Sequence, residues 1–277
     1  MTGHVTAPVA ALADALPSWA TLVRAPNPGP MTLDGTNTWV LRAPGADAGV
    51  VIDPGPLDAA HLAKIAERAP IGLILITHGH PDHVDGARRL SDMLGGAHVL
   101  AANAAHCVGA EPLDHSESFD RFGFEVSALE TPGHTADSVC FLVESGGEEA
   151  IFTGDTILGR GTTVVAYPDG NLGRYLDSLE LLSAYEEVPA LPGHGPALAD
   201  CAAAARFYLA HRRARLAQVR QAMAAGAVTP ADVVATVYAD VDRSLWPAAE
   251  WSVRAQLAYL EGEQRESAPG PGRLDSP

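Results

Sequence analysis

The chain has 277 residues, 47% hydrophobic and 19% charged, a composition that excludes a disordered or fibrous protein. Its net charge of −16 disfavours a protein that coats nucleic acid, because an acidic surface repels phosphate backbones. Its 3 cysteines lie far apart, so we expect no disulfide framework and a reducing, cytoplasmic location. We also expect no membrane contact, since no apolar run reaches the roughly 18 residues of a span and no secretory signal is recognisable.

Short apolar runs alternate with helical stretches over the first 200 residues. Each run is rich in β-branched residues or bounded by Gly, Pro or Asp, and therefore predicts a strand. The predicted strands are Thr38–Leu41, Val50–Ile52, Ile71–Ile76, His98–Ala101, Phe124–Leu129, Val139–Val143 and Ala150–Phe152. Helical spacing of apolar residues predicts helices over Leu57–Ala69, Asp82–Leu94 and Leu172–Glu187. Strands interleaved with helices indicate an α/β protein built in layers.

The composition changes near residue 200. No acidic residue occurs from Cys201 to Ala231, whereas five arginines fall between Arg206 and Arg220. Thr229 and Pro230 are typical of a helix start, and a further helix is predicted over Ala248–Leu260. We predict a main domain over residues 1–205, a small helical domain over 206–265 and a disordered tail over 266–277.

Polar side chains follow directly on five apolar runs. Asp53 follows the second predicted strand, and the third leads into the dense run from Thr77 to His83. Three later apolar runs lead to His134, Asp155 and His194. Since ligands collect beyond strand ends in layered α/β proteins, we expect these side chains to meet at one rim.

Seven of these residues are suitable metal ligands: His78, His80, Asp82, His83, His134, Asp155 and His194. Imidazole nitrogens and carboxylate oxygens without thiolates suit zinc, with manganese and iron as alternatives. Seven ligands are too many for one tetrahedral ion, but they fit two ions that share one carboxylate and one water. This open arrangement predicts a catalytic centre. The remaining histidines lack such a context, and we expect them to be structural or at the surface: His4, His61, His98, His106, His115 and His211.

The pattern H-x-H-x-D-H at residues 78–83, followed by distant His, Asp and His, resembles the metallo-β-lactamase superfamily of dinuclear metal hydrolases. The resemblance covers residues 20–200 and implies a four-layer αββα sandwich. It implies one metal on His78, His80 and His134, a second on Asp82, His83 and His194, and Asp155 as the bridge. Asp53 matches the family's strand-end aspartate, which supports the histidine loop from behind the ligands. One departure is Val84–Ala87, where many members carry two small residues.

A narrower resemblance points to one branch of this superfamily. Asn27–Thr38, Gly154–Thr163 and Leu245–Ala248 are similar to segments of the lactamase-β-like branch, which carries a winged-helix-like C-terminal domain. Members of that branch include single-strand ribonucleases in eukaryotes and acyl-thioester hydrolases in fungi. The branch therefore implies a hydrolase and leaves its substrate open.

We predict a zinc-dependent hydrolase in which a hydroxide bridging two divalent ions attacks a small thioester, ester or lactone. Asp82 and Asp155 are the expected catalytic residues. Arg160, Thr162 and Thr163 directly follow the bridging aspartate and are candidate contacts to an anionic substrate group. A structural glycine-rich turn explains the same segment equally well.

Two alternative functions are also compatible with the sequence. An endoribonuclease acting on single-stranded RNA is favoured by the arginine-rich segment and opposed by the net charge. A non-hydrolytic binding or redox protein on the same scaffold is disfavoured, because no ligand is missing. The C-terminal helices have apolar faces that need a partner, which is the main domain, a second subunit of a homo-oligomer or each other. We expect them to lie near the mouth of the metal site and to limit substrate size.

Overall fold

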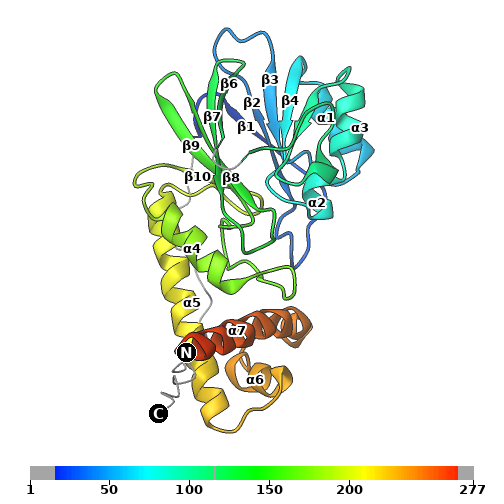
Figure 1. The fold of residues 1–277 in the computed structure, drawn as a ribbon. Helices are drawn as coiled ribbons and strands as arrows, with labels where there is room; N and C mark the ends of the chain where they lie inside the picture. Colours follow the sequence, from blue (N-terminus) through cyan, green and yellow to red (C-terminus); the bar gives the residue numbers. More distant parts are fainter. Residues whose placement is uncertain (1–15, 115–116, 268–277) are drawn as a thin grey trace, which may run out of the picture.

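The computed structural model describes residues 16–114 and 117–267. Two five-stranded sheets pack face to face, and helices cover both outer faces (Figure 1). The strand orders are β1-β2-β3-β4-β5 and β10-β9-β8-β7-β6. The predicted four-layer αββα sandwich, with a mainly helical C-terminal region, is therefore confirmed.

Parallel pairing at the end of each sheet brings loops from different strands together. The first sheet consists of β1 (Ala20–Arg24), β2 (Asn37–Leu41), β3 (Gly49–Ile52), β4 (Ile71–Leu75) and β5 (His98–Leu100). The second consists of β6 (Ser118–Arg121), β7 (Phe124–Glu130), β8 (Val139–Ser145), β9 (Glu148–Gly154) and β10 (Ala190–Pro192). β3, β4 and β5 run parallel, as do β9 and β10. Because parallel strands end at the same edge, the loops after β3 and β4 meet there, as do those after β9 and β10.

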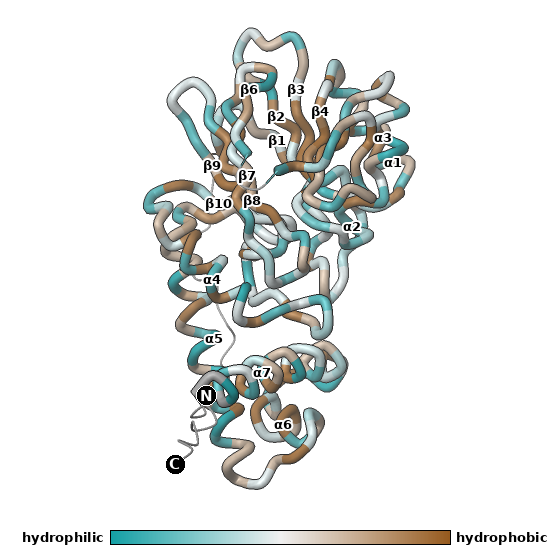
Figure 2. Tube along the Cα trace, in the orientation of Figure 1, coloured by the Kyte–Doolittle hydropathy of each residue, from teal (hydrophilic) through white to brown (hydrophobic). Residues whose placement is uncertain are grey.

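The alternation of side chains along the strands divides the apolar core into three parts. Trp39 and Leu41 of β2 point between the sheets, where they meet Phe141 and Phe152. Val40 of the same strand points to the opposite face, toward helices α1 (Ala59–Ala66) and α3 (Ala87–Met93). Figure 2 shows the apolar strands in the middle of the sandwich. This period of two fixes which strand residues reach a layer of helices and which reach the second sheet.

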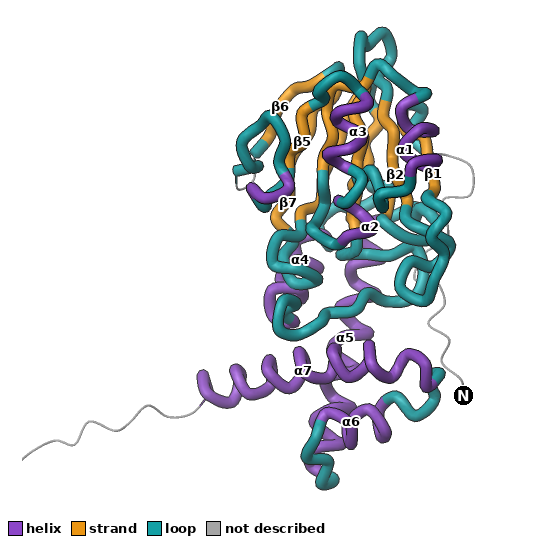
Figure 3. The backbone as a smooth tube through the Cα atoms, turned by 90° about the vertical axis from the view of Figure 1, so that its right-hand side faces the viewer, coloured by secondary structure: helices purple, strands orange, loops and turns teal. Residues whose placement is uncertain are grey.

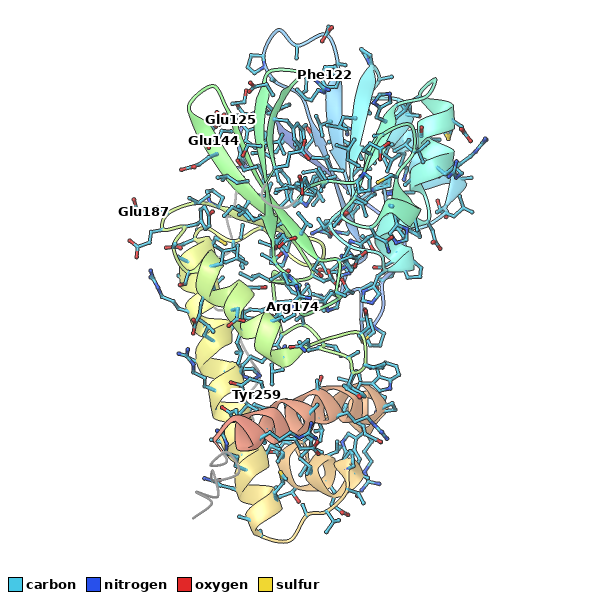
Figure 4. All side chains as sticks on the ribbon, in the orientation of Figure 1. Phe122, Glu125, Glu144, Arg174, Glu187 and Tyr259 are labelled. Atoms are coloured by element: carbon cyan, nitrogen blue, oxygen red, sulfur yellow. The ribbon has the colours of Figure 1, made fainter. Side chains whose placement is uncertain are left out.

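The third part of the core joins the second sheet to the helices below it. It packs between that sheet and helices α4 (Leu172–Leu182) and α5 (Cys201–Ala224), and it continues into α6 (Pro230–Val237) and α7 (Trp246–Ser267). Short 3-10 turns lie at Ala104–His106 and Arg243–Leu245. Figure 3 shows α7 crossing beneath the sandwich with α6 below it. In Figure 4, Tyr259 marks α7 and Arg174 marks the start of α4, where these two helices approach each other.

Several elements differ from the sequence prediction. The helix expected over Asp82–Leu94 is two helices, α2 (Pro81–Val84) and α3. The chain bends between them because Gly86 packs against the Gly55 carbonyl, where an added Cβ would lie 3.0 Å from that oxygen. Strands β1 and β6 were not predicted. β6 lacks a recognisable apolar pattern, because only one of its four residues is apolar. The helix expected to end at Glu187 ends at Leu182.

The C-terminal region contains the predicted helices but is joined to the sandwich by one continuous element. Thr229 caps α6 through a capping box with Asp232, as its sequence position predicted. The proposed domain boundary at residue 205 lies inside α5, and α7 extends to Ser267. Most of the tail predicted over 266–277 lies outside the described residues. Within residues 16–114 and 117–267, no helix combines the length and apolar character that a membrane crossing requires.

Tyr208 fixes α5 to the loop after β9, and its removal tests that link. Its buried hydroxyl accepts a hydrogen bond from Leu158 N (3.1 Å) and donates one to Leu158 O (3.2 Å). Because Tyr208→Phe leaves both buried backbone groups without this partner, we expect the free energy of unfolding to fall by about 1–3 kcal/mol in urea titrations. Tyr167→Phe removes the hydroxyl of an exposed tyrosine and is the control. Equal stability changes in the two variants would contradict this role for Tyr208.

Candidate metal centre

The seven predicted ligands lie together beyond the strand ends, in loops that reach one edge of the sandwich. They form two groups in which the ligand atoms lie within 4.8 Å of one another. The first ligand group is His78, His80, His134 and Asp155, and the second is Asp82, His83 and His194. Helix α2, which carries Asp82 and His83, lies on the side of the sandwich that faces α7 (Figure 3). The sequence pattern therefore gathers in space as two adjacent clusters.

Three imidazole nitrogens of the first ligand group converge. His80 Nδ1 lies 2.9 Å from His78 Nε2 and 3.0 Å from His134 Nε2. Asp155 Oδ2 completes the group at 3.7 Å from His134 Nε2. Zinc bonds of about 2.0–2.1 Å in a tetrahedron place neighbouring ligand atoms roughly 3.3 Å apart. The observed spacings fit a single ion at the centre of this group.

The second ligand group has a similar geometry and shares Asp155 with the first. His194 Nε2 lies 3.2 Å from Asp82 Oδ2, 3.3 Å from His83 Nε2 and 3.4 Å from Asp155 Oδ1. Asp155 thus turns one carboxylate oxygen toward each group. Its Oδ1 is buried without a hydrogen-bond partner among the described residues. An unpaired buried carboxylate oxygen is costly, and a cation satisfies it, so the residues present fit two metal ions.

Asp53 supports the ligand loop from behind, as the family resemblance implied. Its carboxylate accepts hydrogen bonds from Thr77 N (2.8 Å), Thr77 Oγ1 (2.7 Å) and His83 Nδ1 (2.8 Å). The residue is buried and has a left-handed backbone, with φ of 51°. Such a conformation is uncommon outside glycine and indicates a position held by its surroundings.

The partners of the other imidazoles orient their ligand nitrogens. His134 Nδ1 donates to Val164 O at 2.8 Å, and His78 Nδ1 lies 3.0 Å from Thr77 Oγ1. His194 Nδ1 faces Gly35 O at 3.4 Å. A proton on Nδ1 leaves Nε2 free to bind a metal, so these contacts assign the tautomers that the two ligand groups require. His80 differs, because its Nδ1 faces the group.

Thr36 is a functional residue that sequence reasoning missed. Its hydroxyl donates to Asp82 Oδ2 at 2.9 Å and accepts from Asn27 Nδ2 at 3.0 Å. Asn27 and Thr36 belong to the segment Asn27–Thr38. The resemblance of this segment to one branch of the superfamily was the only sequence signal for a role of Thr36. The segment therefore holds the orientation of one carboxylate ligand.

Burial and charge set the protonation of the ligands. Burial lowers the pKa of His134 to about 4, and it lowers the pKa of His78 well below its usual value. Burial alone would raise the pKa of Asp155, but His83 and His194 outweigh it and lower that pKa overall. Burial alone would lower the pKa of His83 and of His194, but the neighbouring carboxylates, Asp155 first among them, outweigh it and raise both, that of His194 to about 10. A divalent cation binds neutral imidazoles and ionised carboxylates, so its binding at the second ligand group would displace protons.

The three candidate substrate residues occupy different environments. Arg160 pairs with Asp34 through two hydrogen bonds, one of them 2.8 Å long, and both side chains are exposed. Thr163 is buried, and its hydroxyl lies 3.3 Å from His134 Nδ1. Thr162 and Thr163 both line a cavity between the sandwich and the C-terminal helices. Contact with a substrate stays a prediction for all three residues.

The remaining histidines that the structure describes lie outside both ligand groups. His61 is buried and hydrogen-bonded to Thr38 Oγ1 at 2.9 Å, so its expected structural role is confirmed. His98 is exposed, and His106 lies 4.0 Å from Asp137. His211 lines the same cavity as Thr162. His4 and His115 lie outside the described residues.

Comparison with known proteins gives matches over most of the chain. Residues 31–194 match a family model described as the metallo-beta-lactamase superfamily, and residues 229–266 match the beta-lactamase associated winged helix domain. The chain is 33% identical over 259 residues to the Beta-lactamase-like protein 2 homolog of Drosophila melanogaster, covering 86% of each chain. It is 33% identical over 225 residues to the Atrochrysone carboxyl ACP thioesterase of Passalora fulva, covering 76% of this chain and 66% of the relative.

The solved structures support the fold. A crystal structure of a metallo-beta-lactamase family protein from Thermus thermophilus is similar, with a TM-score of 0.72 and 22% sequence identity. The similarity covers 90% of this chain and 95% of that protein. It therefore extends beyond the sandwich into the C-terminal helices.

The role of Asp53 is testable without changing any ligand. In Asp53→Asn, the amide NH2 would face the hydroxyl and imidazole donors that the carboxylate now accepts. We expect zinc affinity to fall about 10- to 100-fold, measured by competition with a chromophoric chelator. Asp92→Asn changes an exposed carboxylate on α3 and should leave the affinity unchanged. An unchanged affinity in Asp53→Asn would refute the supporting role.

Gly193 allows the second ligand group to form. A Cβ at this position would lie 2.6 Å from His83 Cε1 and 2.7 Å from Asp155 Oδ1. In Gly193→Ala we expect bound zinc, measured by mass spectrometry, to fall from about two ions to about one per chain. Gly262→Ala on α7 is the matched control, because nothing lies within 4 Å of its added Cβ. Full zinc content in Gly193→Ala would show that the close approach is unimportant.

Proposed function

The chain belongs to the metallo-beta-lactamase superfamily, and on this basis we propose that it is a zinc-dependent dinuclear hydrolase of acyl substrates. Thioesters are the favoured class, with esters and lactones as close relatives in chemistry. The observation that carries this proposal is the pair of ligand groups joined by the two oxygens of Asp155. A relative named as a carboxyl ACP thioesterase supports the choice of an acyl thioester.

The donor set supports zinc as the metal. The two groups contain five imidazoles and two carboxylates and no thiolate. Such ligands suit zinc in an open catalytic site, and manganese or iron are the alternatives. Two divalent ions held here would supply a water of lowered pKa and a Lewis acid for the substrate carbonyl.

The residues of this chain position the reactants. Asp155 fixes the spacing of the two ligand groups, because each of its oxygens faces one of them. Asp82 is the more exposed carboxylate, with 26% of its side chain accessible against 10% for Asp155. Thr36 donates to Asp82 Oδ2, the oxygen that also faces His83 and His194, and so it fixes the orientation of this carboxylate in the second ligand group.

The RNA alternative loses its main sequence support in the folded chain. Three arginines of the basic segment are paired with glutamates: Arg206 with Glu186, Arg213 with Glu180 and Arg220 with Glu263. Arg212 is buried. These pairs neutralise three of the five arginines of α5, so the exposed face of the helix presents no row of unpaired arginines to a phosphate backbone.

The C-terminal helices contribute shape to the proposed active site. Residues of α7 and of the turn before it line one cavity together with Thr162 and Thr163. Neither ligand group contains a residue from beyond His194. This placement supports the proposal that these helices limit substrate size and supply no metal ligand.

An activity screen with metal analysis tests the proposal. Full-length protein loaded with zinc or manganese is assayed on acyl thioesters, lactones, phosphodiesters and single-stranded RNA. We expect about two bound ions and thioester hydrolysis, with a loss of more than about 100-fold in His78→Ala. His98→Ala, at an exposed histidine, should behave as the wild type.

Each alternative predicts a different result in the same screen. Hydrolysis of RNA alone would favour an endoribonuclease, and bound iron without hydrolysis would favour a redox protein. Absence of bound metal in the wild type would favour a binding module and sink the proposal.

A further inference from the structure

A cavity of about 250 Å³ lies between the sandwich and the C-terminal helices. Its polar lining consists of two arginines and one histidine from α5 and of four hydroxyl residues: Arg212, Arg215, His211, Thr162, Thr163, Tyr238 and Ser252. None of the described residues that line it is acidic. In a chain with a net charge of −16, a cavity lined in this way is a local positive site.

Arg212 is the central feature of this cavity. It is only 4% exposed, one of its terminal nitrogens donates to Thr163 O, and its guanidinium lies 5.1 Å from the centre of the Tyr175 ring. Its Nε has no hydrogen-bond partner, and no carboxylate pairs with it in the part of the chain that the structure describes. A buried guanidinium without a counter-charge is costly, so it points to an anion that this chain does not itself supply.

Other arginines on the same helix show the contrast. Arg206, Arg213 and Arg220 are exposed, and each forms a salt bridge with a glutamate. The helix therefore pairs its exposed guanidiniums, where pairing contributes little, and leaves the buried one unpaired. The acidic residues that give the chain its negative net charge do not line this cavity.

Arg215 and His211 complement Arg212 in the cavity. Arg215 is held by Val237 O at 2.7 Å and lies 4.4 Å from the centre of the Tyr238 ring. Burial, followed by the charges of Arg212 and Arg215, lowers the pKa of His211 to about 4. His211 is therefore a neutral imidazole near pH 7, able to donate one hydrogen bond to an anion.

The cavity adjoins the first ligand group. Thr163 and Val164 line it, and the same two residues hold His134, through a hydroxyl 3.3 Å from Nδ1 and a carbonyl oxygen 2.8 Å from it. A group seated against Arg212 is thus separated from a metal ligand by this short segment. The cavity and the first ligand group therefore share one wall, the segment Thr163–Val164.

We propose that this cavity binds an anionic group of the substrate, a carboxylate or a phosphate, with Arg212 as its main contact. The inference rests on the proposed hydrolase function and narrows its substrate to acyl thioesters that carry an anion. A carboxylate would belong to the acyl part, and a phosphate would belong to the carrier thiol. Both present paired oxygens to the planar guanidinium, which binds them through two parallel hydrogen bonds.

Matched substrates test the proposal through kinetics. A succinyl thioester is compared with its uncharged methyl ester, and a butyryl thioester of phosphopantetheine with that of pantetheine. We expect the wild type to prefer the anionic member of one pair, and that pair identifies the source of the anion. In Arg212→Met we expect kcat/KM for the anionic substrate to fall about 10- to 100-fold, and that for its neutral partner to change less than about threefold.

Arg213→Met is the matched control, because Arg213 is the exposed and paired neighbour on the same helix. It should leave both values of kcat/KM unchanged. Arg215→Met, a second cavity variant, should reduce the same preference if Arg212→Met does not fold. An equal loss on both members of the pair would mean that Arg212 only supports Thr163 and would overturn the proposal.

A binding measurement separates this inference from the proposed function. Inorganic phosphate and succinate are titrated by calorimetry into the full-length protein after chelation, so that no metal competes for them. We expect saturable binding of at least one of them, weakened at least about tenfold in Arg212→Met and unchanged in Arg213→Met. Binding without any thioester hydrolysis would refute the hydrolase function and keep the anion site. Hydrolysis with neither anion binding nor anion preference would refute the anion site alone.

Discussion

The buried carboxylate of Asp53 is the contact on which the metal centre depends. It accepts hydrogen bonds from the amide and hydroxyl of Thr77 and from His83 Nδ1, and so it joins the end of β3 to the loop after β4. One anchor therefore fixes the start of the ligand loop and the orientation of a ligand within it. The uncommon backbone of Asp53, with φ of 51°, shows that the chain accepts local strain to place this carboxylate.

The architecture of the sandwich brings the two ligand groups together. Each sheet contains a parallel pair whose strands end at the same edge, β3 with β4 in one and β9 with β10 in the other. Asp155 follows β9 and His194 follows β10, so both reach the histidine loop of the first sheet. Its two oxygens then make Asp155 the shared member of the centre. Both sheets therefore contribute ligands to this centre, and the order of their strands decides which side chains meet there.

The C-terminal helices extend this site. Helix α5 runs without interruption from the second sheet to α6, and one apolar core spans both regions. The cavity between them contains an unpaired buried arginine and lies against the residues that hold His134. In the proposed enzyme the sandwich would supply the reacting centre, and the junction with the helices would select the substrate by its charge.

The sequence alone predicted the layered fold and the candidate ligands, which the fold gathers into two groups, because both depend on local patterns: the spacing of residues 78–83, polar residues directly after apolar strands, and the cap at Thr229. Only the tertiary structure decided the contacts between residues that are far apart in the sequence. Thr36 reaches Asp82 across 46 positions, and Arg212 reaches Thr163 across 49. The break between α2 and α3 arises from packing of Gly86 on Gly55, which helical periodicity does not encode. The missing counter-charge of Arg212 is visible only in the folded chain, because the sequence shows five similar arginines from Arg206 to Arg220, and burial separates Arg212 from the three that pair with glutamates.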